Sequence, residues 1–127
     1  MACLATLRQV WPDPVVEDFA RALLERGIHC VLSVVLGVRA AVQGIPSGFA
    51  LPAFLQSLVS NLVTAGVRLI PLGQTDGQRA IAELEKAVLI ASARAEQATI
   101  DDLGSAAFLV DIASAAHETQ YTRLFRS

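Results

Sequence analysis

Apolar residues recur along the chain at the three- and four-residue spacing of helices that bury one face. This pattern predicts a first helix over residues 2–10, carrying Leu4 and Leu7, which Trp11 and Pro12 end. A second helix follows, because Asp13 is a typical N-cap and a proline at the first helical position loses no hydrogen bond. It closes at Gly27. Its inward positions are Val16, Phe19, Ala20, Leu23 and Leu24.

The stretch 31–42 is apolar on every side. One stripe consists of Val31, Val34, Val35, Val38 and Val42, and a second holds Leu32 and Leu36. A helix that is apolar all round is a central one, so we expect it to be buried. The valines leave a strand as the alternative. The run 28–42 is shorter than the ~20 residues that span a bilayer, so we expect no membrane span.

The strongest helical pattern runs from about residue 52 to residue 70. Its predicted inward stripe is Leu55, Leu58, Leu62, Gly66 and Leu69. A second stripe is polar with one charge and consists of Ser57, Asn61, Thr64 and Arg68. Solvated faces usually carry Lys and Glu. These residues therefore favour a packed, hydrogen-bonded surface, with an ordinary solvated face as the alternative.

Pro71, Gly73 and Gly77 mark a turn over residues 71–77, and a helix over 79–94 is predicted to follow. Its inward positions are Ile81, Leu84, Val88 and Ser92. A capping-box pattern at 99–102 predicts the start of a last helix, which runs to about residue 116. The fold class is therefore all-α, a bundle of about five helices. We assign residues 1–116 to the helical domain and 117–127 to an extended tail.

Composition adds an expectation about the surface. Hydrophobic residues make up 54% and charged residues 17%, whereas charged residues are about 25% of a typical soluble domain. A chain of 127 residues cannot hide this much apolar area, so we expect apolar surface that a partner covers. The net charge of -2 and the single lysine, Lys86, argue against a nucleic-acid binder.

Candidate chemistry is sparse. The sequence offers no nucleophile, acid–base pair or phosphate loop, so we expect a protein that is not an enzyme and has no catalytic residue. His29 and Cys30 are adjacent, and adjacent helical ligands point in different directions, so we expect no metal site there. Nickel binding by His29, Cys30 or His117 stays open. Cys3 and Cys30 are too few for a disulfide framework and are expected to be reduced.

Two segments have the composition of docking surfaces. Around the predicted turn, Arg68 is followed by the uncharged polar residues Gln74, Thr75 and Gln78. The tail, HETQYTRLFRS, mixes the aromatic and arginine residues that dominate interface hot spots. An ordinary frayed end is the alternative for the tail.

These two segments resemble the C-terminal half of UreF, the urease accessory protein. The matching corner residues are Arg68, Pro71, Leu72, Gly73, Gln74, Thr75, Gly77 and Gln78. The matching tail residues are His117, Glu118, Gln120, Tyr121, Arg123, Leu124, Phe125 and Arg126. The helices back to about Leu23 fit the family pattern more loosely. Family members are about twice this length, so we expect a partial UreF-like domain.

The resemblance implies an adaptor in urease maturation rather than an enzyme. UreF-like proteins are homodimers that bind UreD (also called UreH), and the pair recruits the GTPase UreG, which delivers nickel to apo-urease. The resemblance implies a cytoplasmic protein without a cofactor of its own, since the assembled complex handles the nickel. The implied partner-binding residues are Arg68, Gln74, Thr75, Gln78, Gln120, Tyr121, Arg123, Phe125 and Arg126. The alternative is a small helical ligand-binding or regulatory domain with an apolar pocket.

Overall fold

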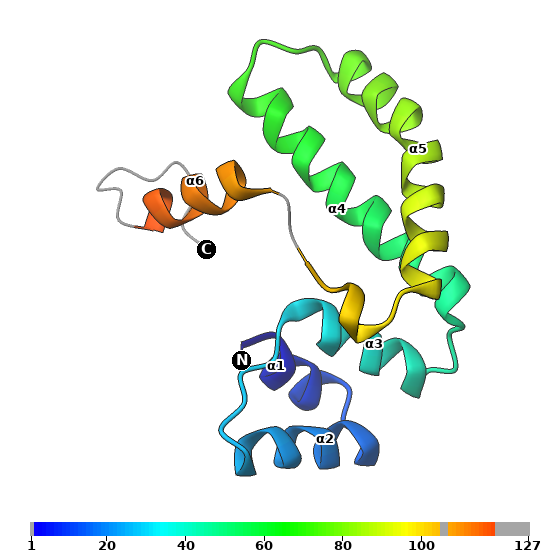
Figure 1. The fold of residues 1–127 in the computed structure, drawn as a ribbon, viewed down its shortest axis with the longest axis vertical. Helices are drawn as coiled ribbons and strands as arrows, with labels where there is room; N and C mark the ends of the chain where they lie inside the picture. Colours follow the sequence, from blue (N-terminus) through cyan, green and yellow to red (C-terminus); the bar gives the residue numbers. More distant parts are fainter. Residues whose placement is uncertain (1, 105–106, 119–127) are drawn as a thin grey trace. The chain divides into compact units, whose positions relative to one another are not determined.

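The computed structural model describes residues 2–104 and 107–118, and every regular element in these ranges is helical (Figure 1). This confirms the all-α fold class. The elements are α1 (Ala2–Val10), α2 (Pro14–Glu25), α3 (Leu32–Val42), α4 (Ser47–Leu69), α5 (Gln74–Gln97), the 3-10 helix η1 (Ile100–Asp102) and α6 (Phe108–Glu118). The chain divides into two units, Met1–Gln97 and Ala98–Ser127, each of which is described by itself.

Helices α1, α2 and α3 enclose a small core in the first unit. Its buried side chains are Leu4, Val16, Ala20 and Val35. The predicted cap at Asp13 is confirmed, since its carboxylate accepts from the backbone N–H groups of Val15 (2.9 Å) and Val16 (3.4 Å). Gly27 follows the helix at φ +63°, a left-handed conformation that glycine adopts without a steric penalty. The inward prediction for Leu24 is wrong, because it is 73% exposed.

Helix α3 forms where it is predicted, but it is not the buried helix that we expected. Of its residues only Val35 is buried, and Val31, just before the helix, is 62% exposed. Leu32 and Leu36 are also exposed. Helices α1 and α2 pack along one side of α3, and the described residues leave much of the opposite side open. A sequence pattern shows that a side can be buried, but it does not show which chain segment covers it.

Helices α4 and α5 form a long antiparallel hairpin (Figure 1). Helix α4 begins five residues before the predicted start and contains Pro52. It starts after Pro46, whose carbonyl accepts from the N–H groups of Phe49 and Ala50, both at 3.0 Å. Helix α5 begins at Gln74 rather than residue 79 and ends at Gln97 rather than residue 94.

Helix α4 is long and apolar enough to cross a membrane by length and composition alone. Core helices of soluble proteins also meet these two criteria.

The inward stripe predicted for α4 is partly wrong. Leu58, Leu62 and Leu69 are exposed, and Leu62 is 65% exposed. The side that meets α5 instead includes Val63 and Val67. On α5 the prediction is better, since Val88 and Ser92 are buried, Ile81 is half-buried and Leu84 is exposed. The Ser92 hydroxyl donates to the Val88 carbonyl at 2.7 Å, so this buried polar group is satisfied.

A polar contact closes the open end of the hairpin. The Ser47 hydroxyl, in the first turn of α4, donates to the Glu96 carboxylate at 2.6 Å. Glu96 lies in the last turn of α5. Its negative charge thereby lies at the positive end of the α4 dipole.

In the second unit the predicted capping interaction forms. The Thr99 N–H and hydroxyl both donate to the Asp102 carboxylate, at 2.8 and 2.9 Å, and these bonds lower the pKa of Asp102. This capping interaction begins only the short helix η1, because the backbone becomes extended at Leu103. The next α-helix starts at Phe108, so the long helix predicted from residue 99 is wrong at its start. His117 lies in the last turn of α6, as predicted.

Candidate functional site

The candidate site is the α4–α5 corner, which we define as residues 68–79. Helix α4 ends where Ile70 turns to an extended conformation, φ -118° and ψ 148°, while its N–H still bonds the Gly66 carbonyl at 2.9 Å. Pro71 follows and has no N–H with which to continue the helix. The Gly73 carbonyl accepts from the Gly77 N–H at 3.1 Å, which is the first helical bond of α5.

Gly77 holds the two helices together at this corner. It is buried, and a Cβ built on it would lie 2.7 Å from Cγ2 of Val67 and 3.6 Å from Cγ1 of Val63. Any side chain would therefore push α5 away from α4. The sequence pattern placed Gly77 in a turn. That assignment is wrong, because Gly77 lies inside α5 and packs against α4.

The predicted corner residues are all exposed. Arg68 lies in the last turn of α4, whereas Gln74, Thr75 and Gln78 lie in the first turns of α5 rather than in a loop. Within the described part of the chain, none of these four side chains makes a hydrogen bond. The hairpin brings them to one end without joining them to one another. Their polar groups are therefore available to a partner.

The polar stripe of α4 is solvated in this chain. Ser57, Asn61, Thr64 and Arg68 are exposed and form no side-chain hydrogen bond among the described residues. The interpretation of a packed, hydrogen-bonded surface is therefore wrong for the chain by itself. Within Met1–Gln97, no side chain makes a hydrogen bond to these groups.

The sequence analysis missed an apolar component of the corner. Leu69, Ile70 and Leu72 are all about half exposed and lie directly beside Arg68. Their signal was available, since a run of large apolar residues stands at a turn where polar residues are usual. The corner thus combines exposed apolar side chains, uncharged polar groups, Arg68 and an exposed ion pair between Asp76 and Arg79 at 3.1 Å. Aromatic or apolar side chains with arginine and a polar rim are the usual make-up of a protein-binding surface.

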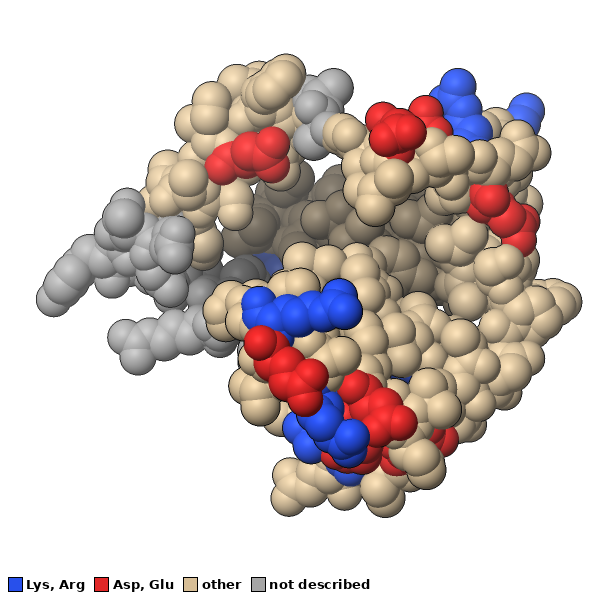
Figure 2. Space-filling view, turned by 60° about the horizontal axis from the view of Figure 1, so that its bottom comes forward, with Lys and Arg blue, Asp and Glu red and all other residues tan. Residues whose placement is uncertain are grey.

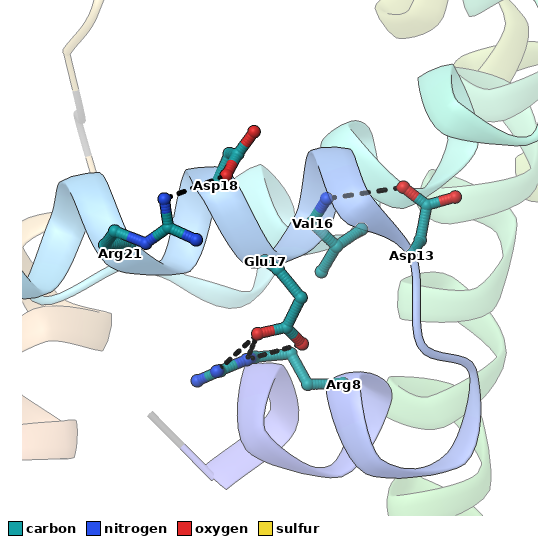
Figure 3. Close-up of polar contacts among 6 residues, drawn as sticks. All are labelled: Arg8, Asp13, Val16, Glu17, Asp18 and Arg21. Atoms are coloured by element: carbon teal, nitrogen blue, oxygen red, sulfur yellow. Dashed lines mark hydrogen bonds and ion pairs between the residues drawn. The ribbon is translucent and has the colours of Figure 1, made fainter.

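A separate polar contact joins α1 to α2 (Figure 3). The Arg8 Nε lies 2.9 Å from each oxygen of the Glu17 carboxylate. The hydrogen bond from Arg8 lowers the pKa of Glu17, and the same bond raises the pKa of Arg8. Arg21 pairs with Asp18 on the same helix at 3.2 Å. The first ion pair joins α1 to α2 and the second lies within α2, and neither forms an acid–base pair.

Metal-binding groups do not converge in the described ranges, where no three His, Cys, Asp or Glu side chains form a group that could hold an ion. Cys3 and Cys30 are free, half-buried thiols beside the α1–α3 core, and His29 is exposed.

On the face drawn in Figure 2, charged side chains gather in small groups separated by uncharged surface. The predicted tail residues Gln120, Tyr121, Arg123, Phe125 and Arg126 lie outside the described residues.

Comparisons with known proteins agree with one another. The UreF family model matches residues 1–85. The urease accessory protein UreF of Rhodopseudomonas palustris strain BisB5 is 48% identical over 126 residues, which are 99% of this chain and 51% of that protein. The protein of the same name from Bradyrhizobium diazoefficiens is 58% identical over 97 residues, 76% of this chain and 40% of its own. The chain spans about half the length of these curated relatives. No solved structure matches it.

Proposed function

Because the chain belongs to the UreF family of urease accessory proteins, we propose that it serves urease maturation as an adaptor without a catalytic step of its own. The similarity to UreF over 99% of the chain carries this proposal. The make-up of the α4–α5 corner supports it, since exposed amides and apolar side chains suit docking better than bond-making chemistry.

The partners in this proposal are UreD (UreH), the GTPase UreG and apo-urease, with the chain acting as a homodimer in the cytoplasm. Nickel is cargo of the assembled complex and not a resident cofactor of this chain. At the corner, Leu69, Ile70 and Leu72 supply the apolar centre of the contact, while Arg68, Gln74, Thr75 and Gln78 supply a polar rim. In the tail, Gln120, Tyr121, Arg123, Phe125 and Arg126 bind UreD.

The tail is tested by co-purification. Deletion of residues 117–127 should abolish co-purification with a UreD-type partner while leaving the helix content of the remaining chain unchanged by circular dichroism. A chain without the tail that binds UreD as the whole chain does would exclude this use of the tail.

The corner is tested by a matched pair of substitutions on α5. Gln74→Ala, in its first turn, should weaken assembly of the complex about tenfold, and Arg68→Ala should do the same. Gln97→Ala, at the opposite end of the same helix, is exposed and should have no effect. Helix content is measured for each variant. A loss of helicity in Gln74→Ala would make that residue structural, and equal effects of Gln74→Ala and Gln97→Ala would contradict docking at the corner.

A further inference from the structure

The two cysteines of the chain lie beside the same small core. Cys3 is in the first turn of α1, and Cys30 is in the loop between α2 and α3. Both are free, half-buried thiols, and both pack against the four buried side chains that α1, α2 and α3 enclose. Neither belongs to the α4–α5 corner or to the tail, so the proposed docking function leaves both thiols unused.

The arrangement of α1 and α2 fixes where Cys3 lies. The two helices run in opposite directions (Figure 1), and Leu4 of α1 lines the same pocket as Ala20 and Leu24 of α2. One helical turn further along α1, Arg8 pairs with Glu17 of α2. The first turn of α1 therefore lies beside the last turns of α2, which is where the loop carrying Cys30 begins.

The loop keeps Cys30 at this same end of the core. After the turn at Gly27, the Ile28 N–H bonds the Leu23 carbonyl at 2.9 Å, which holds the loop against the end of α2. Cys30 follows two residues later, and its Sγ lies 3.6 Å from the Val31 carbonyl oxygen. Helix α3 then packs against both α1 and α2. The start of α1 and the start of α3 thus meet at one end of the core, each with one cysteine.

We propose that Cys3 and Cys30 form a reversible intramolecular disulfide when the chain meets a low-molecular-weight disulfide such as oxidised glutathione. One protein thiolate attacks the small disulfide, which gives a mixed disulfide and releases one small thiolate. The second protein thiolate attacks the protein sulfur of the mixed disulfide and releases the other small thiolate. The two protein thiols are oxidised, the small disulfide is reduced to two thiols, and the protons of the protein thiols pass to them.

Both positions allow the backbone adjustment that a disulfide requires, with its Cα atoms about 4.4–6.8 Å apart. Cys3 lies in a first helical turn, whose N–H groups have no intrahelical acceptor, and Cys30 lies in a loop. The bond closes a loop over residues 4–29 and thereby restricts the unfolded chain, so it should stabilise the α1–α3 core. In a reducing cytosol the pair stays as free thiols, so the bond would form only under oxidising conditions. The proposal does not depend on the urease partners.

The experiment uses the whole 127-residue chain. The reduced chain is incubated with oxidised glutathione, and the products are identified by mass spectrometry. We expect a monomer that has lost two hydrogens and carries no glutathione. Trypsin cleaves after Arg8, Arg26 and Arg39, so fragments 1–8 and 27–39 should stay joined until dithiothreitol separates them. The urea midpoint of the oxidised chain should exceed that of the reduced chain, and dithiothreitol should restore the lower value.

Cys3→Ser and Cys30→Ser are the matched controls. Each variant keeps one thiol, which should take up a single glutathione without a rise in the urea midpoint. Helix content of the reduced variants is measured by circular dichroism, and alanine replaces serine at a position where serine lowers it. The proposal is overturned if the unchanged chain only gains glutathione or only forms linked dimers, with fragments 1–8 and 27–39 separate. An internal bond that leaves the urea midpoint unchanged would overturn the stabilising effect.

Discussion

Gly77 is the residue on which the geometry of the α4–α5 corner depends most directly. Gly77→Ala would place a Cβ 2.7 Å from Val67 Cγ2, so the helices must separate. We expect a loss of unfolding free energy of about 1–3 kcal/mol, the usual effect of overpacking. Urea unfolding measures it.

The matched control is Gly66→Ala in α4, where a Cβ would meet no atom within 4 Å. Alanine is the better helix former there and should stabilise the chain by up to about 1 kcal/mol. Equal behaviour of the two variants would show that Gly77 does not set the distance between α4 and α5.

The ion pair between α1 and α2 gives a pH dependence at the same scale. Because Arg8 lowers the pKa of Glu17 in the folded chain below its ordinary value of 4.5, folding is favoured by the ionised carboxylate. This contribution is complete above about pH 4.5 and disappears as pH falls through the lowered pKa. Arg8→Gln should therefore flatten the decrease of stability on the acid side of pH 4.5.

Urea midpoints measured between pH 3 and pH 6 test this expectation. Glu17→Gln should flatten the same part of the curve, and adding Arg8→Gln to it should change the slope no further. If the urea midpoint of the Arg8→Gln chain falls with decreasing pH as steeply as that of the unchanged chain, other carboxylates produce the pH dependence.

Local chemistry explains which single-residue predictions from the sequence were confirmed. Asp13 and Gly27 were identified correctly because a helix cap involves only neighbours along the chain. Gly77 was not, because its role depends on Val67 of a different helix. At the candidate site, the exposure of Arg68 and Gln74 could be anticipated from their polarity. Apolar periodicity favours burial of Leu69, and only its place in an apolar run at a turn indicated that it is exposed.

Among the elements, α4 shows how far a predicted helix boundary can lie from the observed one. The apolar pattern predicted a start at about residue 52, whereas the helix begins at Ser47. Pro52 is thus an interior proline, and the Gly48 carbonyl lacks the N–H donor that residue 52 would normally supply. The caps and loops that decide such boundaries are weaker signals than apolar periodicity.

Replacing this proline is informative. Pro52→Ala supplies the absent N–H and should increase the unfolding free energy by about 1–3 kcal/mol, with slower amide exchange over residues 47–52. Pro52 also lies beside Gln56 and Val88 on the hairpin surface. A decrease in stability would mean that the contacts of its ring outweigh the recovered hydrogen bond.

The identity of each helix was easier to predict than its environment. The α3 pattern correctly indicated a helix, because its length exceeds that of ordinary strands. It wrongly indicated burial, because apolarity on every side does not say which segment covers the helix, and most of α3 is exposed.

At the scale of the whole molecule, the two docking segments belong to different units. The corner lies in Met1–Gln97 and the tail in Ala98–Ser127. We therefore expect a chain shortened to residues 1–97 to lose binding to a UreD-type partner and to keep the thermal unfolding transition of α1–α5. Pull-down with the partner and circular dichroism of the shortened and whole chains measure this. Loss of both binding and folding would show that the two units do not act separately.

The contact between Ser47 and Glu96 also has a consequence for synthesis. The two residues are 49 positions apart in the sequence, and a ribosome adds about 5–20 residues per second. Helix α4 ends at Leu69, 27 positions before Glu96, so the contact that closes the hairpin can form only about 1–5 seconds after the last residue of α4 has been added. Until Glu96 has left the ribosome, the side of α4 that packs against α5 has no complete partner in the nascent chain. A chaperone that shields apolar helices should therefore be needed most before Glu96 emerges.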